Sequence, residues 1–152
     1  MSDPIDIKLE QDESGLFDIS INDDGDLTHE MGFNTAIFLS LLMERRADES
    51  EVTIPELRRG WWGNTLNEDT TDEWGSKIWL YYQARNRNEE LEACIGFSEQ
   101  SLAWMVEDSH AIGIDFNSST LAGTRITLNG IITVSPDEIQ TVNFNLWEFT
   151  GT

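Results

Sequence analysis

The residue types that most often carry enzyme chemistry are few in this chain and lie far apart. His29 and His110 have no partner at the HExxH or a comparable ligand spacing. Cys94 is the only cysteine and falls in an expected helix, which excludes an intrachain disulfide and favours a small buried hydrophobic side chain. Ser98, in GFSEQ, lies in the middle of the same helix, where the strained turn of a serine nucleophile cannot form. We therefore expect no metal site and no cofactor.

Carboxylates are so abundant that they cannot mark a catalytic pair. The chain has 29 Asp and Glu against 9 Lys and Arg, a formal net charge of -20. A glycan hydrolase needs two carboxylates at a set separation, and almost any two of them would qualify from sequence alone. The charge also argues against direct binding of nucleic acid, because affinity for phosphates comes mainly from lysine and arginine. An acidic surface instead favours basic partner surfaces.

One stretch, ERRADESEVTIPELRRGWWGN (residues 44–64), gathers residue types that are costly to place without partners. Arginine presents a rigid fork of donors to carboxylates, and tryptophan has a large apolar face with one N–H that needs an acceptor when buried. We interpret the stretch as a buried joint, in which the arginines pair with carboxylates of this chain or of a partner and one tryptophan anchors a neighbour. The residues of this joint are Arg45, Arg46, Arg58, Arg59, Trp61 and Trp62.

A purely structural interpretation of the same residues stays open. Arg45 and Arg46 would end the preceding helix as cations favourable to its dipole, and the two tryptophans would cap the core of the domain. At least one residue of each pair is expected to act in this way. Adjacent residues of an extended or turning segment point in different directions, so both tryptophans can hardly enter one small core.

The elements that must position these residues follow from the hydrophobic periodicity. FDISIN (residues 17–22) alternates apolar and polar residues before the turn DDGD, and predicts an early strand. Asn34 can cap a helix with the apolar body TAIFLSLLMERRA (residues 35–47). SKIWLYYQAR predicts a short aromatic helix, and Asn88 opens a longer one. One face of the longer helix carries Leu91, Ile95, Ser98, Leu102, Met105 and Val106.

From Ala111 onward the apolar period changes to two, which predicts a three-stranded antiparallel meander with SPDE as the turn between its last two strands. Asn129 and Gly130 could also fold RITL back onto IITV as a hairpin. We favour a continuous strand, because Leu128, Gly130 and Ile132 then share one face. The alternating residues are Ile112, Ile114 and Phe116, then Ile126, Leu128, Ile132 and Val134, then Val142, Phe144 and Leu146.

The last expected strand, residues 140–149, becomes apolar on both faces near its end. One face carries the alternating residues just named, and the other passes from Asn143 and Asn145 to aromatic residues. A terminal strand of this kind is usually covered by something, so we add it to the predicted partner interface. The interface residues in this strand are Val142, Phe144, Leu146, Trp147 and Phe149.

Together these elements predict an α+β fold, with apolar and amphipathic helices packed on a small antiparallel sheet that includes a C-terminal three-stranded meander. One domain is expected over residues 1–152. Within it, residues 1–16 form an arm whose composition suits an ordered or a flexible state, residues 17–110 the strand, helices and Arg/Trp loop, and residues 111–150 the sheet. No apolar run approaches the ~20 residues of a membrane span, and the acidic N-terminus differs from a signal peptide. We expect a soluble protein retained where it is made.

The order of motifs resembles a known family. TAIFLSLLMERRA, a loop with a proline, RRGWWGN, WGSKIWLYYQAR, the helix with SLAWMVEDSHA and strands ending in FNLWEF resemble Mu-like phage tail proteins, which are related to the baseplate wedge component known as the sheath initiator of contractile tails. The resemblance covers about residues 19–149, and its most specific elements are RRGWWG and GSKIWL. Glu44, Asn64 and Ile54-Pro55-Glu56 depart from the family pattern, which leaves open which acid pairs with which arginine.

The resemblance implies a structural protein of the virion and not an enzyme, assembled in the host cytoplasm and located in the tail baseplate. It implies contacts with baseplate wedge proteins and with tail hub or tube proteins, and a C-terminal sheet on which the first ring of sheath protein assembles by strand exchange. Six copies per virion are expected, without strong self-association in isolation and without membrane or direct nucleic acid contacts. The alternatives are an acidic cytoplasmic adaptor, a DNA-mimic inhibitor and a glycan hydrolase.

Overall fold

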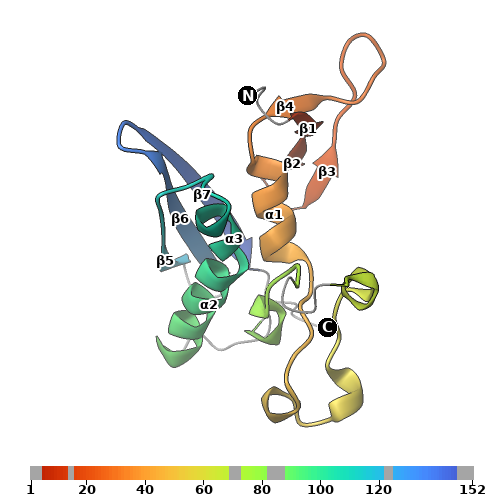
Figure 1. Cartoon of the computed structure of the whole chain (residues 1–152), viewed down its shortest axis with the longest axis vertical. Helices are drawn as coiled ribbons and strands as arrows, with labels where there is room; N and C mark the ends of the chain where they lie inside the picture. Colours follow the sequence, from red (N-terminus) through yellow and green to blue (C-terminus); the bar gives the residue numbers. More distant parts are fainter. Residues whose placement is uncertain (1–4, 14–15, 69–72, 82–87, 122–124, 147–152) are drawn as a thin grey trace. The chain divides into compact units, whose positions relative to one another are not determined.

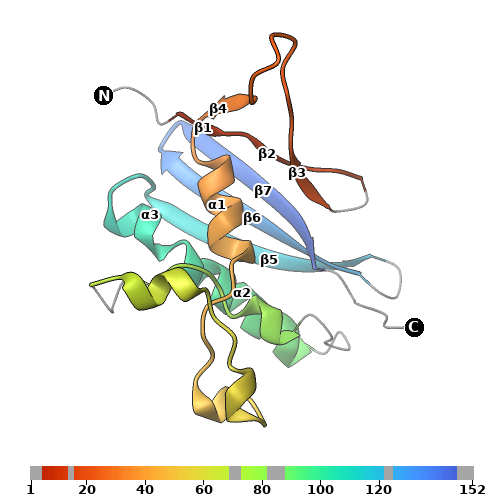
Figure 2. The ribbon, with the colours of Figure 1, turned by 90° about the vertical axis from the view of Figure 1, so that its right-hand side faces the viewer.

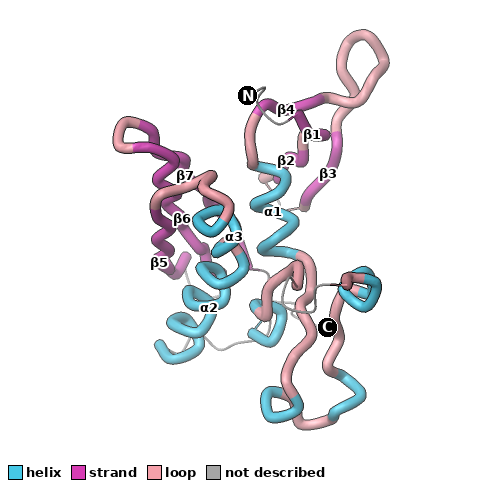
Figure 3. Tube along the Cα trace, in the orientation of Figure 1, coloured by secondary structure: helices cyan, strands magenta, loops and turns pink. Residues whose placement is uncertain are grey.

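The computed structural model describes residues 5–13, 16–68, 73–81, 88–121 and 125–146. The chain forms two compact units, residues 1–39 and residues 40–152. Figure 1 shows the order of the elements along the chain, and Figure 3 distinguishes helices, strands and loops. That the whole chain is one domain stays a prediction.

The first unit is built from short antiparallel strands. β1 (Ile5–Ile7) pairs with β4 (His29–Met31), and β2 (Leu9–Gln11) pairs with β3 (Phe17–Ile19). The early strand predicted from FDISIN is therefore present as β3. The N-terminal arm, which the sequence left open between an ordered and a flexible state, contains two of these strands.

The turn predicted at DDGD is also present. Ile21 and Leu27 form an isolated antiparallel bridge on either side of it. Asn22 Oδ1 accepts hydrogen bonds from the main-chain N–H groups of Asp24 and Asp26 at 3.1 and 3.0 Å. Such local side-chain bonding is the reason that asparagine favours turns.

α1 (Asn34–Leu42) begins where expected and ends earlier than expected. The sequence predicts a helix to Ala47, but the residues after Leu42 bond to Ser76 instead. Ser76 N donates to Met43 O at 2.8 Å, and Arg45 N donates to Ser76 O at 2.9 Å. The prediction that Arg45 and its neighbour Arg46 charge the C-terminus of this helix is therefore wrong.

The described residues between α1 and α2 form loops and short 3-10 helices. The 3-10 helices span Glu49–Glu51, Pro55–Leu57, Trp62–Leu66 and Ile78–Tyr81. The last of them is the described part of the short aromatic helix predicted from SKIWLYYQAR, whose residues 82–85 lie outside the described residues. We call residues 43–81 the Arg/Trp segment.

The long predicted helix is divided into α2 (Asn88–Ser101) and α3 (Ala103–Glu107). The predicted apolar face is largely correct, because Ser98, Leu102 and Met105 are buried. Val106 is exposed, contrary to the prediction. The reason is the break at Leu102, whose backbone (φ -106°, ψ 3°) departs from the helix, so that α3 does not continue the face of α2.

The C-terminal meander is confirmed, and with it the α+β fold class. β5 (Gly113–Leu121), β6 (Arg125–Ser135) and β7 (Glu138–Leu146) form an antiparallel sheet in the order β5-β6-β7, with a turn at SPDE between β6 and β7. Figure 2 shows these three strands side by side. α2 and α3 both pack against β5. Among the sheet residues whose burial is described, the buried apolar side chains are those of Phe116, Leu128, Ile132 and Val142.

Asn129 and Gly130 lie in the middle of β6, as the preferred interpretation predicted, and not in a hairpin turn. Gly130 is paired with Phe116 of β5, and an added Cβ at Gly130 would lie 2.6 Å from Phe116 Cζ. The glycine therefore makes room for a buried aromatic ring, a common use of glycine inside a strand.

Candidate partner interfaces

Cys94 and Ser98 of α2 are both fully buried. No group of three or more His, Cys, Asp or Glu among the described residues is placed to hold a metal ion. Ser98 Oγ donates to the carbonyl of Cys94 at 2.8 Å inside α2, so its hydroxyl is engaged with the helix backbone. Burial raises the pKa of Cys94 to about 12, which keeps the thiol protonated at neutral pH. No helix in the described part of the chain is long and apolar enough to cross a membrane.

The Arg/Trp segment brings two stretches of chain together by main-chain bonds. Trp61 N donates to Glu44 O at 2.8 Å and Ala47 N donates to Arg58 O at 3.0 Å, so residues 44–47 run beside residues 58–61. The turn into the tryptophans uses positive φ at Arg59 (51°) and Gly60 (111°). An added Cβ at Gly60 would lie 2.9 Å from Arg46 Cβ, which explains the glycine after the arginine pair.

The second arginine pair is held by acceptors of this chain. Arg59 Nη1 lies 2.7 Å from Glu44 Oε1. Arg58 Nε donates to Ala47 O at 2.6 Å, and its Nη1 lies 3.5 Å from Glu49 Oε1. Both side chains therefore link one loop of the segment to another. The Arg59 side chain is 52% exposed, so this chain alone does not bury the joint, and its burial by a partner stays a prediction.

The first pair is bound more loosely to carboxylates. Arg45 Nη2 donates to the main-chain carbonyl of Glu73, while its Nε is 3.8 Å from Glu73 Oε2, too far for a hydrogen bond. Arg46 Nη1 donates to the carbonyl of Arg59 at 3.5 Å. These two arginines therefore act mainly on main-chain carbonyls, which links the end of α1 to later parts of the segment.

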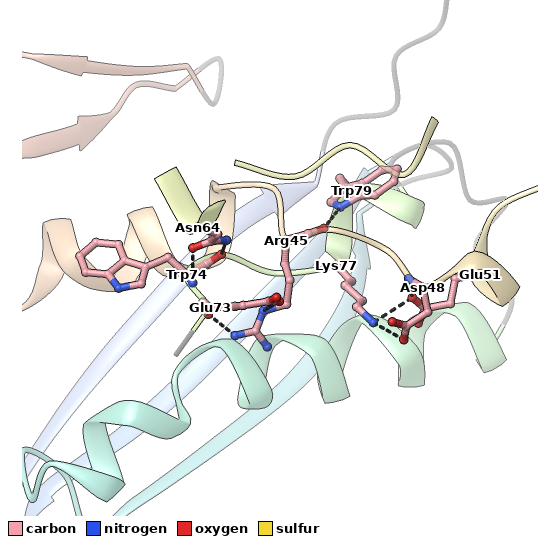
Figure 4. Close-up of polar contacts among 8 residues, drawn as sticks. All are labelled: Arg45, Asp48, Glu51, Asn64, Glu73, Trp74, Lys77 and Trp79. Carbon is pink, nitrogen blue, oxygen red and sulfur yellow. Dashed lines mark hydrogen bonds and ion pairs between the residues drawn. The ribbon is translucent and has the colours of Figure 1, made fainter. Parts of the chain in front are cut away.

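Lys77 is a cation of the joint that was not among the predicted interface residues. Its Nζ lies 2.9 Å from Asp48 Oδ2 and 2.8 Å from Glu51 Oε2, while its side chain is mostly buried (Figure 4). Burial opposes the charge, but the hydrogen bonds to Glu51 and Asp48 outweigh it and raise the pKa of Lys77 above its usual value. The same hydrogen bond to Lys77 lowers the pKa of Asp48.

The tryptophans of the segment have different environments. Trp79, which was not singled out, is 9% exposed, donates its Nε1 proton to Arg45 O at 2.8 Å, and lies under the Arg59 guanidinium at 4.9 Å from the ring centroid. Trp61 and Trp62 are 36% and 70% exposed. Neither enters the core, so the prediction that one of them caps it is wrong.

Trp61 and Trp62 instead form a surface cluster with Trp74. The Trp61 ring centroid lies 5.8 Å from that of Trp62 and 6.2 Å from that of Trp74. An added Cβ at Gly63 would lie 2.2 Å from Trp61 Cη2, so the second glycine of RRGWWG makes room for this ring. Two hydrogen bonds of 3.0 Å join the Asn64 side-chain amide to the Trp74 main chain (Figure 4).

The surface cluster of Trp61, Trp62 and Trp74 was only partly predictable. The position of Trp74 before GSKIWL placed it in a distinctive motif. Its contact with Trp61 depends on Asn64, which brings residues 64 and 74 together and gave no signal of its own.

β7 is the second predicted interface. One side of it pairs with β6, and its other side pairs with no strand of the described residues. Val142 is 3% exposed, so its side chain belongs to the core of this chain. Phe144 and Leu146 lie in β7, opposite Leu128 and Ile126. Trp147 and Phe149 lie outside the described residues.

The chain belongs to a family of phage proteins. The family model described as phage protein GP46 matches residues 33–138, well over half of the chain. The matched range contains the whole Arg/Trp segment and ends at the first residue of β7. This match confirms the predicted relationship to Mu-like phage proteins.

Two relatives in this family are similar to the chain over about two thirds of its length. The chain is 30% identical to the baseplate protein gp46 of Escherichia phage Mu over 99 residues, which are 63% of this chain and 66% of that protein. It is also 30% identical, over 102 residues, to the Mu-like prophage FluMu protein gp46 of Haemophilus influenzae, covering 67% of each chain. The match therefore spans just under two thirds of the phage Mu protein.

Proposed function

We propose that this protein is a structural component of a contractile phage tail baseplate and not an enzyme. In this proposal it occupies the inner wedge in the manner of a sheath initiator, contacts wedge and hub or tube proteins, and is present in six copies in the virion. The phage Mu relative is named a baseplate protein, which supports the location. The observation that carries the proposal is the exposure of Trp62 on a segment held by many polar contacts.

The surface cluster of Trp61, Trp62 and Trp74, which we call the Trp cluster, has the properties of a partner anchor. Trp62 is 70% exposed in this chain, so most of its surface is available to a partner. A tryptophan contributes most to binding when a partner pocket buries it fully. Its support is fixed in advance by the pair Arg59–Glu44 and by Asn64, so little loop ordering is needed on binding. In this proposal Trp61 and Trp62 contact a wedge protein, and the arginines hold them in place.

β7 supplies the proposed sheath contact. A strand with one unpaired side can accept a strand from another chain through main-chain hydrogen bonds, while side-chain pockets fix the register. The residues after Ala111 include only one base, Arg125, and the acidic character of the chain discourages pairing of two copies. The first sheath subunit would then add its strand beside β7.

The anchor is tested by Trp62→Ala in tails assembled with the variant as the sole copy. The isolated chain should stay folded, while incorporation into baseplates should fall, because loss of an anchor costs about 2 kcal/mol or more. The matched control is Ile112→Ala, which also removes an exposed apolar side chain and should incorporate normally. Normal incorporation of the Trp62 variant would exclude the anchor.

The strand template needs a deletion that spares the core. Since Val142 is buried, removal from residue 142 onward would damage the fold, so the deletion should remove residues 147–152 only. Electron microscopy should then show baseplates that cannot start a sheath. Normally sheathed tails would exclude these residues from the template, and loss of the baseplate from a folded variant would assign them to the wedge contact.

A further inference from the structure

The first unit exposes an apolar strand face that the proposed function does not use. Ile5 and Met31 are directly paired across β1 and β4, and are 68% and 67% exposed. Ile7 lies on the same face as Ile5, two residues along the strand, and is also exposed. We call Ile5, Ile7 and Met31 the N-terminal apolar face.

This face lies in the most acidic part of the chain. Residues 1–39 contain ten Asp or Glu and one base, Lys8. Lys8 forms a hydrogen-bonded ion pair with Glu10, and the hydrogen bond raises the pKa of Lys8. Among the described residues of this unit, the exposed carboxylates are Asp6, Glu10, Asp12, Glu13, Asp18, Asp23, Asp24 and Asp26.

The combination of apolar face and acidic surroundings selects one kind of partner. A short strand pair is only weakly stable by itself. Burying its exposed isoleucine and methionine side chains against a partner would therefore stabilise it. A second copy of this chain would bring carboxylates against carboxylates, and anionic lipid or nucleic acid would be repelled in the same way. A protein surface with an apolar centre and a border of lysine and arginine would match both features.

We propose that the N-terminal apolar face binds a basic protein surface of this kind, at a site distinct from the Trp cluster. The strands that form it precede residue 33, where the family match begins. The contact is therefore proposed for a part of the chain that the family match does not include. It does not depend on the baseplate assignment.

The first test uses the purified full chain and a defined probe, a basic peptide of alternating leucine and lysine. Calorimetry should show binding that weakens about tenfold in the double variant Ile5→Ser/Met31→Ser, with unchanged folding by circular dichroism. The matched control is Ile139→Ser, an exposed isoleucine of β7, which should bind as the parent does. Equal weakening by the control, or none by the double variant, would overturn the proposal.

A second pair of variants separates the effect of charge near the apolar face from the effect of total charge. Asp6→Asn/Asp18→Asn removes two exposed carboxylates of the first unit, where Asp6 lies between Ile5 and Ile7 in the sequence, and should weaken peptide binding several-fold at low salt. Glu107→Asn/Asp108→Asn, at the end of α3, removes the same net charge from exposed positions and should have a smaller effect. Equal effects would mean that only the total charge matters, and the site would be rejected.

The natural partner is identified by photo-crosslinking from position 5 of the full chain in phage-producing cells, with position 139 as control. The expected product is a crosslink to a segment of another phage protein that is rich in lysine or arginine, and charge reversal there should abolish it. Crosslinks to a second copy of this chain, to an acidic segment, or only within the same molecule would overturn the proposal. So would a yield no higher than that of the control.

Discussion

The Arg/Trp segment and the C-terminal sheet are held together by different forces. The sheet is stabilised by the main-chain pairing of β5, β6 and β7 and by the burial of apolar residues such as Leu128 and Ile132. In the segment, few residues are buried, and the chain path depends on polar side chains and on glycines at particular positions. The regular main-chain pairing of the sheet tolerates most changes of surface side chains. The conformation of the Arg/Trp segment depends on single side-chain contacts, so the loss of any one of them should alter it.

The difference also concerns how each region would meet a partner. β7 offers main-chain groups, which any extended strand can bind, so its specificity must come from side chains nearby. The Trp cluster offers large apolar surfaces fixed by Asn64 and Gly63, which suit one particular pocket. The following variants test whether stability resides in the sheet and precise shape in the segment.

The largest loss of stability is expected from Leu128→Ala in β6. Leu128 is fully buried, and removal of its side chain should lower the free energy of unfolding by about 3 kcal/mol through lost burial and a residual cavity. Urea unfolding measures this effect. Ile139→Ala, in β7 but exposed, should change stability by less than about 0.5 kcal/mol. Similar losses in both variants would refute the assignment of the core.

A smaller loss is expected from Gly75→Ala in the Arg/Trp segment. Gly75 has φ of 100°, and an added Cβ would lie 2.5 Å from Met43 O, so the substitution should cost about 2 kcal/mol. Gly96→Ala in α2 is the control, because an added Cβ there meets no heavy atom within 4 Å. The control should gain about 0.5 to 1 kcal/mol from helix propensity. A neutral Gly75 variant would show that the segment is less tightly defined than its contacts suggest.

The smallest effect concerns pH and Lys77→Met. Since Lys77 lowers the pKa of Asp48, the pair contributes stability at neutral pH that is lost as the pH falls below about 4. The raised pKa of Lys77 means that the same contribution is also lost above about pH 10.5. The variant should be less stable than the parent at pH 7 and should lose less on acidification to pH 3.

Urea midpoints at pH 7, 5 and 3 measure this difference. Arg46→Met is the control, because Arg46 contacts the Arg59 carbonyl rather than a carboxylate. Its acid dependence should follow that of the parent. Parallel pH curves for the parent and the Lys77 variant would mean that the ion pairs of Lys77 do not contribute to folding.

Regular elements were predictable because their signals are local. The period-two pattern after Ala111 predicted the meander, and the shared face of Leu128 and Ile132 correctly placed Gly130 inside a strand. The motifs RRGWWG and GSKIWL were sufficient to identify the family, which the match over residues 33–138 confirms. Each of these inferences needed only neighbouring residues or a side-chain period.

The tertiary structure decided what depends on residues far apart in the chain. The apolar pattern of α1 continues past Leu42, but the helix ends there because Ser76 supplies competing main-chain bonds. Trp61 and Trp62 carry the same sequence signal as Trp79, yet only Trp79 is buried, beneath Arg59. Residue type determined that these side chains need partners. Which residue each tryptophan contacts depends on residues far apart in the sequence, and a local sequence pattern carries no information about such contacts.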